Sequence, residues 1–157
     1  MRIVAISALI AAFLDQLSKY LVIHVMELWR LKSIKVFPPY LNFEYGENRG
    51  INFGLGDELG QTPLIAIALA VCFAIIWWMR RAPQPAMARL GAGFLIGGAL
   101  GNVFDRAWYG YVLDFINNDC CGIGNPFVYN VADIFIFAGA IGLIFFSKDD
   151  KPQKKGA

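Results

Sequence analysis

The sequence predicts an all-α integral membrane protein of four transmembrane helices, with a small β-sheet outside the membrane. Three observations support this fold class. Hydrophobic residues make up 57% of the 157 residues and charged residues only 17%, which is far from the average for soluble proteins. The mean hydropathy is +0.51. Several apolar runs approach or exceed roughly 20 residues, the length that a helix needs to cross a hydrocarbon core of about 30 Å.

The predicted spans cover residues 3–26, 63–79, 88–104 and 127–146. We expect the first span to be retained, because no convincing small-x-small cleavage site follows its apolar stretch. The second span contains no charge and ends on two tryptophans before two arginines, which is typical of a membrane boundary. In the third span the glycines at 93, 97 and 101 recur every four residues, and this stripe predicts close helix packing.

The connecting segments 27–62 and 106–126 are more polar. Leu41, Phe43 and Tyr45 alternate with polar residues, and a second alternation at Ile51, Phe53 and Leu55 follows an expected turn over residues 46–50. Alternation of this kind predicts two β-strands. We expect the sheet to lie outside the membrane, because an open sheet edge cannot face lipid.

Basic residues predict the orientation. They cluster at Arg2, between the second and third spans at Arg80, Arg81 and Arg89, and in the tail after residue 147. The positive-inside rule makes these regions cytoplasmic, so both termini are expected inside and segments 27–62 and 106–126 outside. The net charge is only +2, and no basic stripe interleaves with aromatic residues, which argues against a nucleic-acid partner.

Cysteine usage excludes some classes of site. The chain has three cysteines, too few and too poorly spaced for a disulfide framework or a zinc site. Cys72 lies in an apolar run and is expected to pack in the core. A cysteine nucleophile at Cys120 or Cys121 would need a base such as His24, which we interpret instead as a residue of the membrane interface.

Ionisable residues inside spans are costly and are hypotheses for function by default. Asp15 and Lys19 lie four residues apart on one helix face, either as a structural ion pair or in a direct role. Asn130 and Asp133 share a face of the fourth span, and six residues from Phe127 place Asp133 about 9 Å inside the outer boundary. Three polar residues close the third span, and an acidic residue follows it in an apolar run: Asn102, Asp105, Arg106 and then Asp114.

Two carboxylates held together at low dielectric share one proton, because both cannot easily ionise. If Asp114 returns to the depth of Asp133, the pair can perform aspartic peptidase chemistry, in which one carboxylate activates water and the other donates a proton. Two alternatives stay open at this point. One is a proton or ion transporter that uses Asp15 and Asp105 with the pair, and the other is an accessory membrane subunit with a polar core.

Five motifs in order resemble those of the lipoprotein signal peptidases, also called signal peptidase II or prolipoprotein signal peptidases. They are Asp15-Gln-Leu-Ser-Lys19, Asn48-Arg-Gly50-Ile-Asn-Phe53-Gly54, Gly97-Gly-Ala-Leu-Gly-Asn102-Val-Phe-Asp105-Arg106, Val112-Leu-Asp114-Phe-Ile and Asn130-Val-Ala-Asp133. The resemblance covers nearly the whole chain as a single membrane-embedded peptidase domain. It implies four helices with a small extracytoplasmic β-cradle and a short peri-membrane helix.

The resemblance also implies a function. A family member removes signal peptides from bacterial prolipoproteins in the cytoplasmic (inner) membrane, cleaving before a diacylglyceryl-modified cysteine, and needs no metal or organic cofactor. The implied partners are the precursor and membrane lipid, with the chain acting as a monomer. The catalytic pair is Asp114 and Asp133. The residues that bind substrate or support the site are Asp15, Lys19, Asn48, Gly50, Asn102, Asp105, Arg106 and Asn130.

The sequence departs from the family pattern at two places and matches a motif of another protease class at one. Asn52 stands where many family members have alanine, and residues 117–126, with both adjacent cysteines, match no family motif. These departures concern the rim of the substrate groove. The string Gly54-Leu-Gly-Asp57 matches that of another class of intramembrane aspartic protease. Because Asp57 lies in a polar segment and not within an apolar helix, we interpret this match as coincidence.

Overall fold

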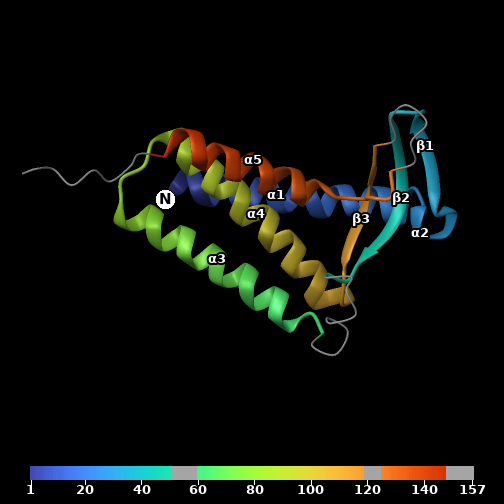
Figure 1. The fold of residues 1–157 in the computed structure, drawn as a ribbon, viewed down its shortest axis with the longest axis horizontal. Coiled ribbons are helices and arrows are strands. Elements are labelled where there is room, and N and C mark those ends of the chain that lie inside the picture. The colour runs from blue at the N-terminus through green and yellow to red at the C-terminus, as the bar shows by residue number, and fades with distance from the viewer. Residues whose placement is uncertain (51–59, 119–124, 148–157) are drawn as a thin grey trace, which may run out of the picture.

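The structure is a computed structural model, and it describes residues 1–50, 60–118 and 125–147. The long helices are α1 (Arg2–Lys19), α3 (Thr62–Arg81), α4 (Ala86–Tyr109) and α5 (Val131–Phe146). A π-helical turn, η1 (Tyr20–Val25), continues α1, and α2 (Leu28–Leu31) is a single turn. The strands are β1 (Ser33–Phe37), β2 (Leu41–Asn48) and β3 (Val112–Asn117). The helices form an elongated bundle with the sheet at one end (Figure 1).

Helix α4 is the centre of the bundle, and its glycines permit this. Gly93, Gly97 and Gly101 face α1, which confirms the predicted packing stripe. A Cβ on Gly101 would lie 2.6 Å from a carboxylate oxygen of Asp15 on α1. On another face of α4, a Cβ on Gly98 would lie 2.5 Å from the carbonyl oxygen of Ala132 on α5. Both neighbouring helices therefore approach α4 more closely than any side chain there would allow.

Helix α3 is peripheral. Its buried side chains are Cys72, Ile75 and Met79, which contact Ala92 and Ile96 of α4. The burial of Cys72 confirms its predicted place in the core. Most of the remaining surface of α3 is apolar and exposed, as expected for a helix whose solvent is lipid.

The sheet is three-stranded, in the order β1-β2-β3, and both pairs are antiparallel. One of its faces rests on η1 and α2 through Val22, Ile23 and Leu28, which pack in one cluster with Leu113 and Phe115 of β3. This contact places β3, a strand that follows α4, directly beside the π-helical turn that continues the first helix. Residues far apart in the sequence thus meet where the sheet joins the bundle (Figure 1).

The predicted strand pairing is wrong in detail. The expected turn over residues 46–50 does not begin at Gly46, because β2 continues to Asn48 and pairs with β3 there. The first partner of β2 is β1, in which Ile34 and Val36 alternate with Ser33 and Lys35, and the second is β3, an apolar run. The alternation at Ile51, Phe53 and Leu55 lies outside the described residues.

The helix boundaries also require corrections. The first predicted span corresponds to α1 with η1, and the second to α3. The third helix continues to Tyr109, five residues beyond the predicted end at 104, and stops where Gly110 adopts a φ of 80° that favours glycine. Helix α5 begins at Val131 and not at 127, because Asn130 caps it and Tyr129 pairs with Ile116 of β3.

Within the described ranges, three helices are long and apolar enough to cross a membrane: α1 with η1, α3 and α4. Helix α5 is apolar but has only 16 residues. The number of four spans therefore stays a prediction. The later start of α5 also removes the helical count from Phe127 on which the depth of about 9 Å for Asp133 was based, because Asp133 is only two positions beyond the first residue of the helix.

Candidate active site

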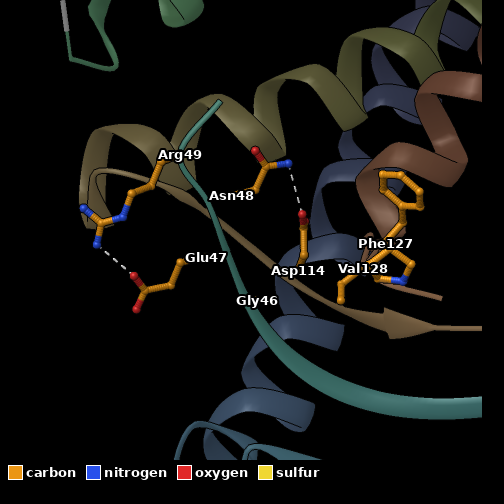
Figure 2. Close-up of a pocket in the computed structure, with 8 residues that line it drawn as sticks. Gly46, Glu47, Asn48, Arg49, Asp114, Phe127 and Val128 are labelled. Carbon is orange, nitrogen blue, oxygen red and sulfur yellow. Dashed lines mark hydrogen bonds and ion pairs between the residues drawn. The ribbon is translucent and has the colours of Figure 1, made fainter. Parts of the chain in front are cut away.

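Strand β3 supplies the first acidic residue of the site. Asp114 lies opposite Gly46 in the β2–β3 register, and its side chain is buried. Asn48, two residues further along β2, shares the face of Gly46 because strand side chains alternate. Its Nδ2 donates to Oδ2 of Asp114 over 3.1 Å (Figure 2). Strand pairing thus carries Asn48, from the first half of the chain, to Asp114.

The start of α5 supplies the second acidic residue. Asn130 caps the helix, because its Oδ1 accepts the N–H of Asp133 at 3.0 Å. Asp133 returns the bond, since its Oδ2 accepts the N–H of Asn130 at 3.2 Å. This capping box fixes the carboxylate of Asp133 at the amino end of α5, where the helix dipole stabilises negative charge.

Two asparagine amides connect the two acidic side chains. Nδ2 of Asn130 donates to Oδ1 of Asp114 over 2.6 Å and lies 3.2 Å from Oδ1 of Asn102. Nδ2 of Asn102 in turn donates to Oδ1 of Asp133 over 3.0 Å. The pair therefore belongs to one network, in which each carboxylate accepts a hydrogen bond from an amide that also contacts the other amide.

A buried ion cluster lies on the bundle side of this network. Lys19 is only 3% exposed, and its Nζ lies 2.8 Å from Asp15 and 2.7 Å from Asp105. The same Nζ donates to Oδ1 of Asn102 over 3.4 Å. Gln16 donates to Oδ2 of Asp15 and to Oδ1 of Asp105. The expected Asp15–Lys19 pair is confirmed, and it gains a second carboxylate from α4.

Each carboxylate of the ion cluster also holds a backbone N–H next to the acidic pair. Oδ1 of Asp15 accepts the N–H of Ala132 at 2.9 Å, one residue before Asp133. Oδ2 of Asp105 accepts the N–H of Leu113 at 3.1 Å, one residue before Asp114. Lys19 thus stabilises two anchors, each of which fixes the backbone beside one member of the pair.

An open cleft of about 260 Å³ lies over Asp114. One wall is the end of β2, from Gly46 to Arg49, and the other is the segment from Pro126 to Val128 (Figure 2). Burial, together with the negative charge of Asp133, raises the pKa of the Asp114 carboxyl to about 6. A carboxyl that holds its proton up to about pH 6 at the floor of a cleft is suited to donate that proton to a substrate.

Arg106 and Gly50 lie at the border of the network. Nη1 of Arg106 is 3.5 Å from the carbonyl oxygen of Asn102, and its Nε is buried without a hydrogen-bond partner among the described residues. Gly50 has a φ of 97°, which favours glycine, and its N–H donates to Oδ1 of Asn48 over 3.0 Å. This bond orients the Asn48 amide so that its nitrogen faces Asp114.

The structure thus brings all ten predicted site residues into one connected region, with Gly50 joined only through Asn48. Sequence analysis missed three contributors. Gln16 stands within a quoted motif directly after Asp15, which was the sequence signal for it, and the structure adds its hydrogen bond to Asp105. Phe127 and Val128 line the cleft but carry no sequence signal. Cys120, Cys121, Asn52 and Asp57 lie outside the described residues.

The described part of the chain contains no group of three or more His, Cys, Asp or Glu residues arranged to hold a metal ion. The absence of a metal or organic cofactor stays a prediction. In the site as described, lysine and asparagine side chains neutralise or bridge the carboxylates.

An acidic pair at one end of an apolar helical bundle defines the class of aspartic membrane peptidases. The comparisons with known proteins agree. The family model for signal peptidase (SPase) II matches residues 7–148, so the chain belongs to the signal peptidase II family. These peptidases remove signal peptides from prolipoproteins.

Relatives and solved structures are similar over most of their length. The lipoprotein signal peptidase of Alteromonas mediterranea is 40% identical, covering 100% of this chain and 87% of the relative. The lipoprotein signal peptidase of Methylorubrum extorquens is 38% identical, covering 94% of this chain and 86% of the relative. A bacterial membrane enzyme solved by the in meso method at 1.9 Å has a TM-score of 0.77 at 26% identity, covering 90% of this chain and 89% of that one. A second bacterial membrane enzyme, solved by the same method at 2.3 Å, has a TM-score of 0.74 at 27% identity, covering 90% of this chain and 84% of that one.

Proposed function

We propose that this chain cleaves bacterial prolipoproteins directly before a diacylglyceryl-modified cysteine, with Asp114 and Asp133 as the catalytic residues. The observation that carries the proposal is the connection of the two acidic side chains through Asn102 and Asn130 beside the cleft. This connection gives the two carboxyl groups different surroundings, as acid and base roles require.

The two roles follow from these surroundings. Asp114 keeps its proton up to about pH 6 and is the general acid, because burial disfavours its charged form. Asp133 is the general base, because the amino end of α5 and the Asn102 amide stabilise its charge. Asp133 takes a proton from water while the oxygen attacks the scissile carbonyl carbon, and Asp114 donates its proton to the carbonyl oxygen. Collapse of the tetrahedral intermediate breaks the C–N bond as the leaving amine takes the proton from Asp133, and Asp114 recovers a proton from the hydroxyl group that becomes the new carboxylate.

The diacylglyceryl group on the substrate cysteine positions the substrate at the cleft. The cleft lies where the sheet meets the end of the bundle, next to apolar helix surface. Acyl chains that remain in the membrane would hold the modified cysteine at this level. Each buried methylene contributes about 0.8 kcal/mol, so two chains supply binding that short side chains near the cleaved bond cannot. We expect loose recognition of the apolar signal segment and strict recognition around the cysteine.

The proposal also covers the orientation of the protein in the membrane. The N-terminus and the α3–α4 connection lie at the end of the bundle opposite the sheet (Figure 1). Arg2, Arg80, Arg81 and Arg89 are at that end, which favours its placement on the cytoplasmic side. The site then lies near the outer face of the bacterial inner membrane, where the chain works as a monomer.

The test is cleavage of one precursor by the purified protein in detergent, with and without the diacylglyceryl group. We expect cleavage of the lipid-modified precursor only, and its loss in both Asp114→Asn and Asp133→Asn, because water activation and protonation need one residue each. Lys35→Ala, an exposed position on β1, is the matched control and should keep full activity.

Two outcomes would contradict parts of the proposal. Near-normal turnover by either aspartate variant would remove that residue from catalysis. Equal rates for the two precursors would defeat the lipid-positioning argument while leaving the peptidase chemistry in place.

A further inference from the structure

The buried side-chain amide of Asn117 holds together the two ends of the segment 117–126, which matches no family motif. Asn117, the last residue of β3, is 1% exposed. Its Nδ2 donates to the carbonyl oxygens of Asn125 over 2.7 Å and of Phe127 over 3.2 Å. Because both neighbours are carbonyl oxygens, only the nitrogen of this amide can face them. One side chain therefore joins the two ends of a segment whose middle, residues 119–124, lies outside the described part of the chain.

Further bonds fix the same segment to β3. Oδ1 of Asn125 accepts the N–H of Phe127 at 3.0 Å, and Nδ2 of Asn125 donates to the carbonyl oxygen of Asn118 over 3.0 Å. Tyr129 exchanges two backbone hydrogen bonds with Ile116, at 2.8 and 3.0 Å. Residues 125–129 are thus held along β3 from both ends.

The segment held in this way is one wall of the cleft. Pro126, Phe127 and Val128 line it opposite the end of β2. A Cβ on Gly46 would lie 3.5 Å from Cβ of Val128 and 3.6 Å from Cβ of Asp114. A Cβ at position 46 would be in ordinary van der Waals contact with both side chains, so β2, Val128 and Asp114 approach one another closely at this part of the cleft (Figure 2).

We propose that Asn117 is a positioning residue that holds this wall and thereby limits the size of the substrate side chain next to the cleaved bond. The proposal rests on the proposed peptidase function. It assigns the selection of substrates by size to residues 126–128, while the aspartates perform the chemistry. A role restricted to stability would lower cleavage of all precursors equally, whereas a wall that moves changes their ranking.

The experiment compares lipid-modified precursors that carry alanine or leucine immediately before the modified cysteine. The variants are Asn117→Leu, which keeps the branching at Cγ but lacks the donor, and Val128→Ala, which widens the cleft directly. We expect the ratio of kcat/KM for the alanine precursor over the leucine precursor to fall by about tenfold in both, the effect of one pocket contact. Lys35→Ala, an exposed position on β1 away from this wall, should leave the ratio unchanged.

Each remaining outcome is decisive. An unchanged ratio in a folded Asn117→Leu protein would show that the amide only stabilises the chain, and this would overturn the proposal. If Asn117→Leu does not fold, Asn125→Ala and Val128→Ala replace it, and unchanged ratios in both would also overturn it. Failure of the wild-type protein to cleave any precursor would instead refute the proposed function, and the size selection with it.

Discussion

Asp114 holds its proton through a balance between burial and hydrogen bonding. Burial and the charge of Asp133 disfavour ionisation, whereas the amides of Asn130 and Asn48 favour it by donating to the carboxylate. The net effect leaves the pKa at about 6, above the ordinary value for aspartate. A carboxyl that titrates near pH 6 can be followed in the pH dependence of cleavage, so its role is accessible to kinetics.

The pH profile of cleavage follows from this pKa. Below it Asp114 carries the proton that it must donate, and above it the proton is lost. We therefore expect kcat/KM to fall as the pH rises above about 6, with the measured value belonging to the coupled pair. Asn48→Ala removes a bond that favours the charged form, so it should move the falling limb to higher pH. A limb that does not move would contradict the assignment of the acid to Asp114.

Lys19 is the second residue whose removal should be informative. Lys19→Met would leave the carboxylates of Asp15 and Asp105 buried without their cation. Breaking a buried pair in this way costs about 3–5 kcal/mol, so we expect a clear drop in the thermal unfolding temperature in detergent and loss of activity. Asp15→Asn should likewise act mainly through stability.

Lys35→Met is the matched control for Lys19→Met, because that lysine is exposed on β1. It should unfold at the wild-type temperature. The ion cluster would lose its proposed anchoring role if Lys19→Met kept both normal stability and normal cleavage.

At the scale of elements, the close approach of α4 and α5 fixes the position of Asp133. Gly98 faces the carbonyl oxygen of Ala132, the residue immediately before Asp133. Backbone atoms cannot move aside as a flexible side chain can. The first turn of α5 is therefore held by packing against α4 on one side and by the Asp15 carboxylate on the other.

Gly98→Ala tests this packing. The added methyl group would lie 2.5 Å from the Ala132 carbonyl oxygen, so α5 must shift. We expect a loss of about 1–3 kcal/mol in the free energy of unfolding, and a fall in kcat larger than the change in KM, because the general base moves. Gly142→Ala on the other end of α5 meets nothing closer than 3.3 Å and should have a smaller effect on both. Equal effects of the two substitutions would count against a specific link to Asp133.

At the scale of the whole molecule, the N-terminus and the α3–α4 connection lie at the end of the bundle opposite the sheet (Figure 1). Arg2, Arg80 and Arg81 belong to that end, whereas the cleft lies beside β2 and β3 at the other. This separation predicts the result of cysteine labelling in a background without the natural thiols. A reagent added from outside should label Lys35→Cys on β1 but not Pro83→Cys between α3 and α4, two exposed positions. The reverse pattern would invert the proposed topology.

The sequence by itself determined the apolar helices, the glycine stripe of α4 and the residues of the site. Helix periodicity and apolar runs are local patterns, so they can be seen without any partner. The pairing of Asp15 with Lys19 was predictable for the same reason, since a spacing of four places both on one helix face. The motif resemblance selected Asp114 and Asp133 because it carries family information that composition and spacing lack.

Only the tertiary structure decided how these parts meet. The bond from Ala132 to Asp15 joins residues 117 positions apart, and that from Lys19 to Asn102 joins residues 83 apart. Contacts of this range leave no periodic trace, so neither the second carboxylate on Lys19 nor the pairing of β2 with β3 was visible in the chain. The same holds for the start of α5, where the Asn130 cap and the pairing of Tyr129 with β3 compete with an apolar run that local pattern alone extends to Phe127. Local sequence fixes which segments are helical or extended, whereas packing and long-range hydrogen bonds fix where they begin, what they pair with and how the two aspartates are brought together.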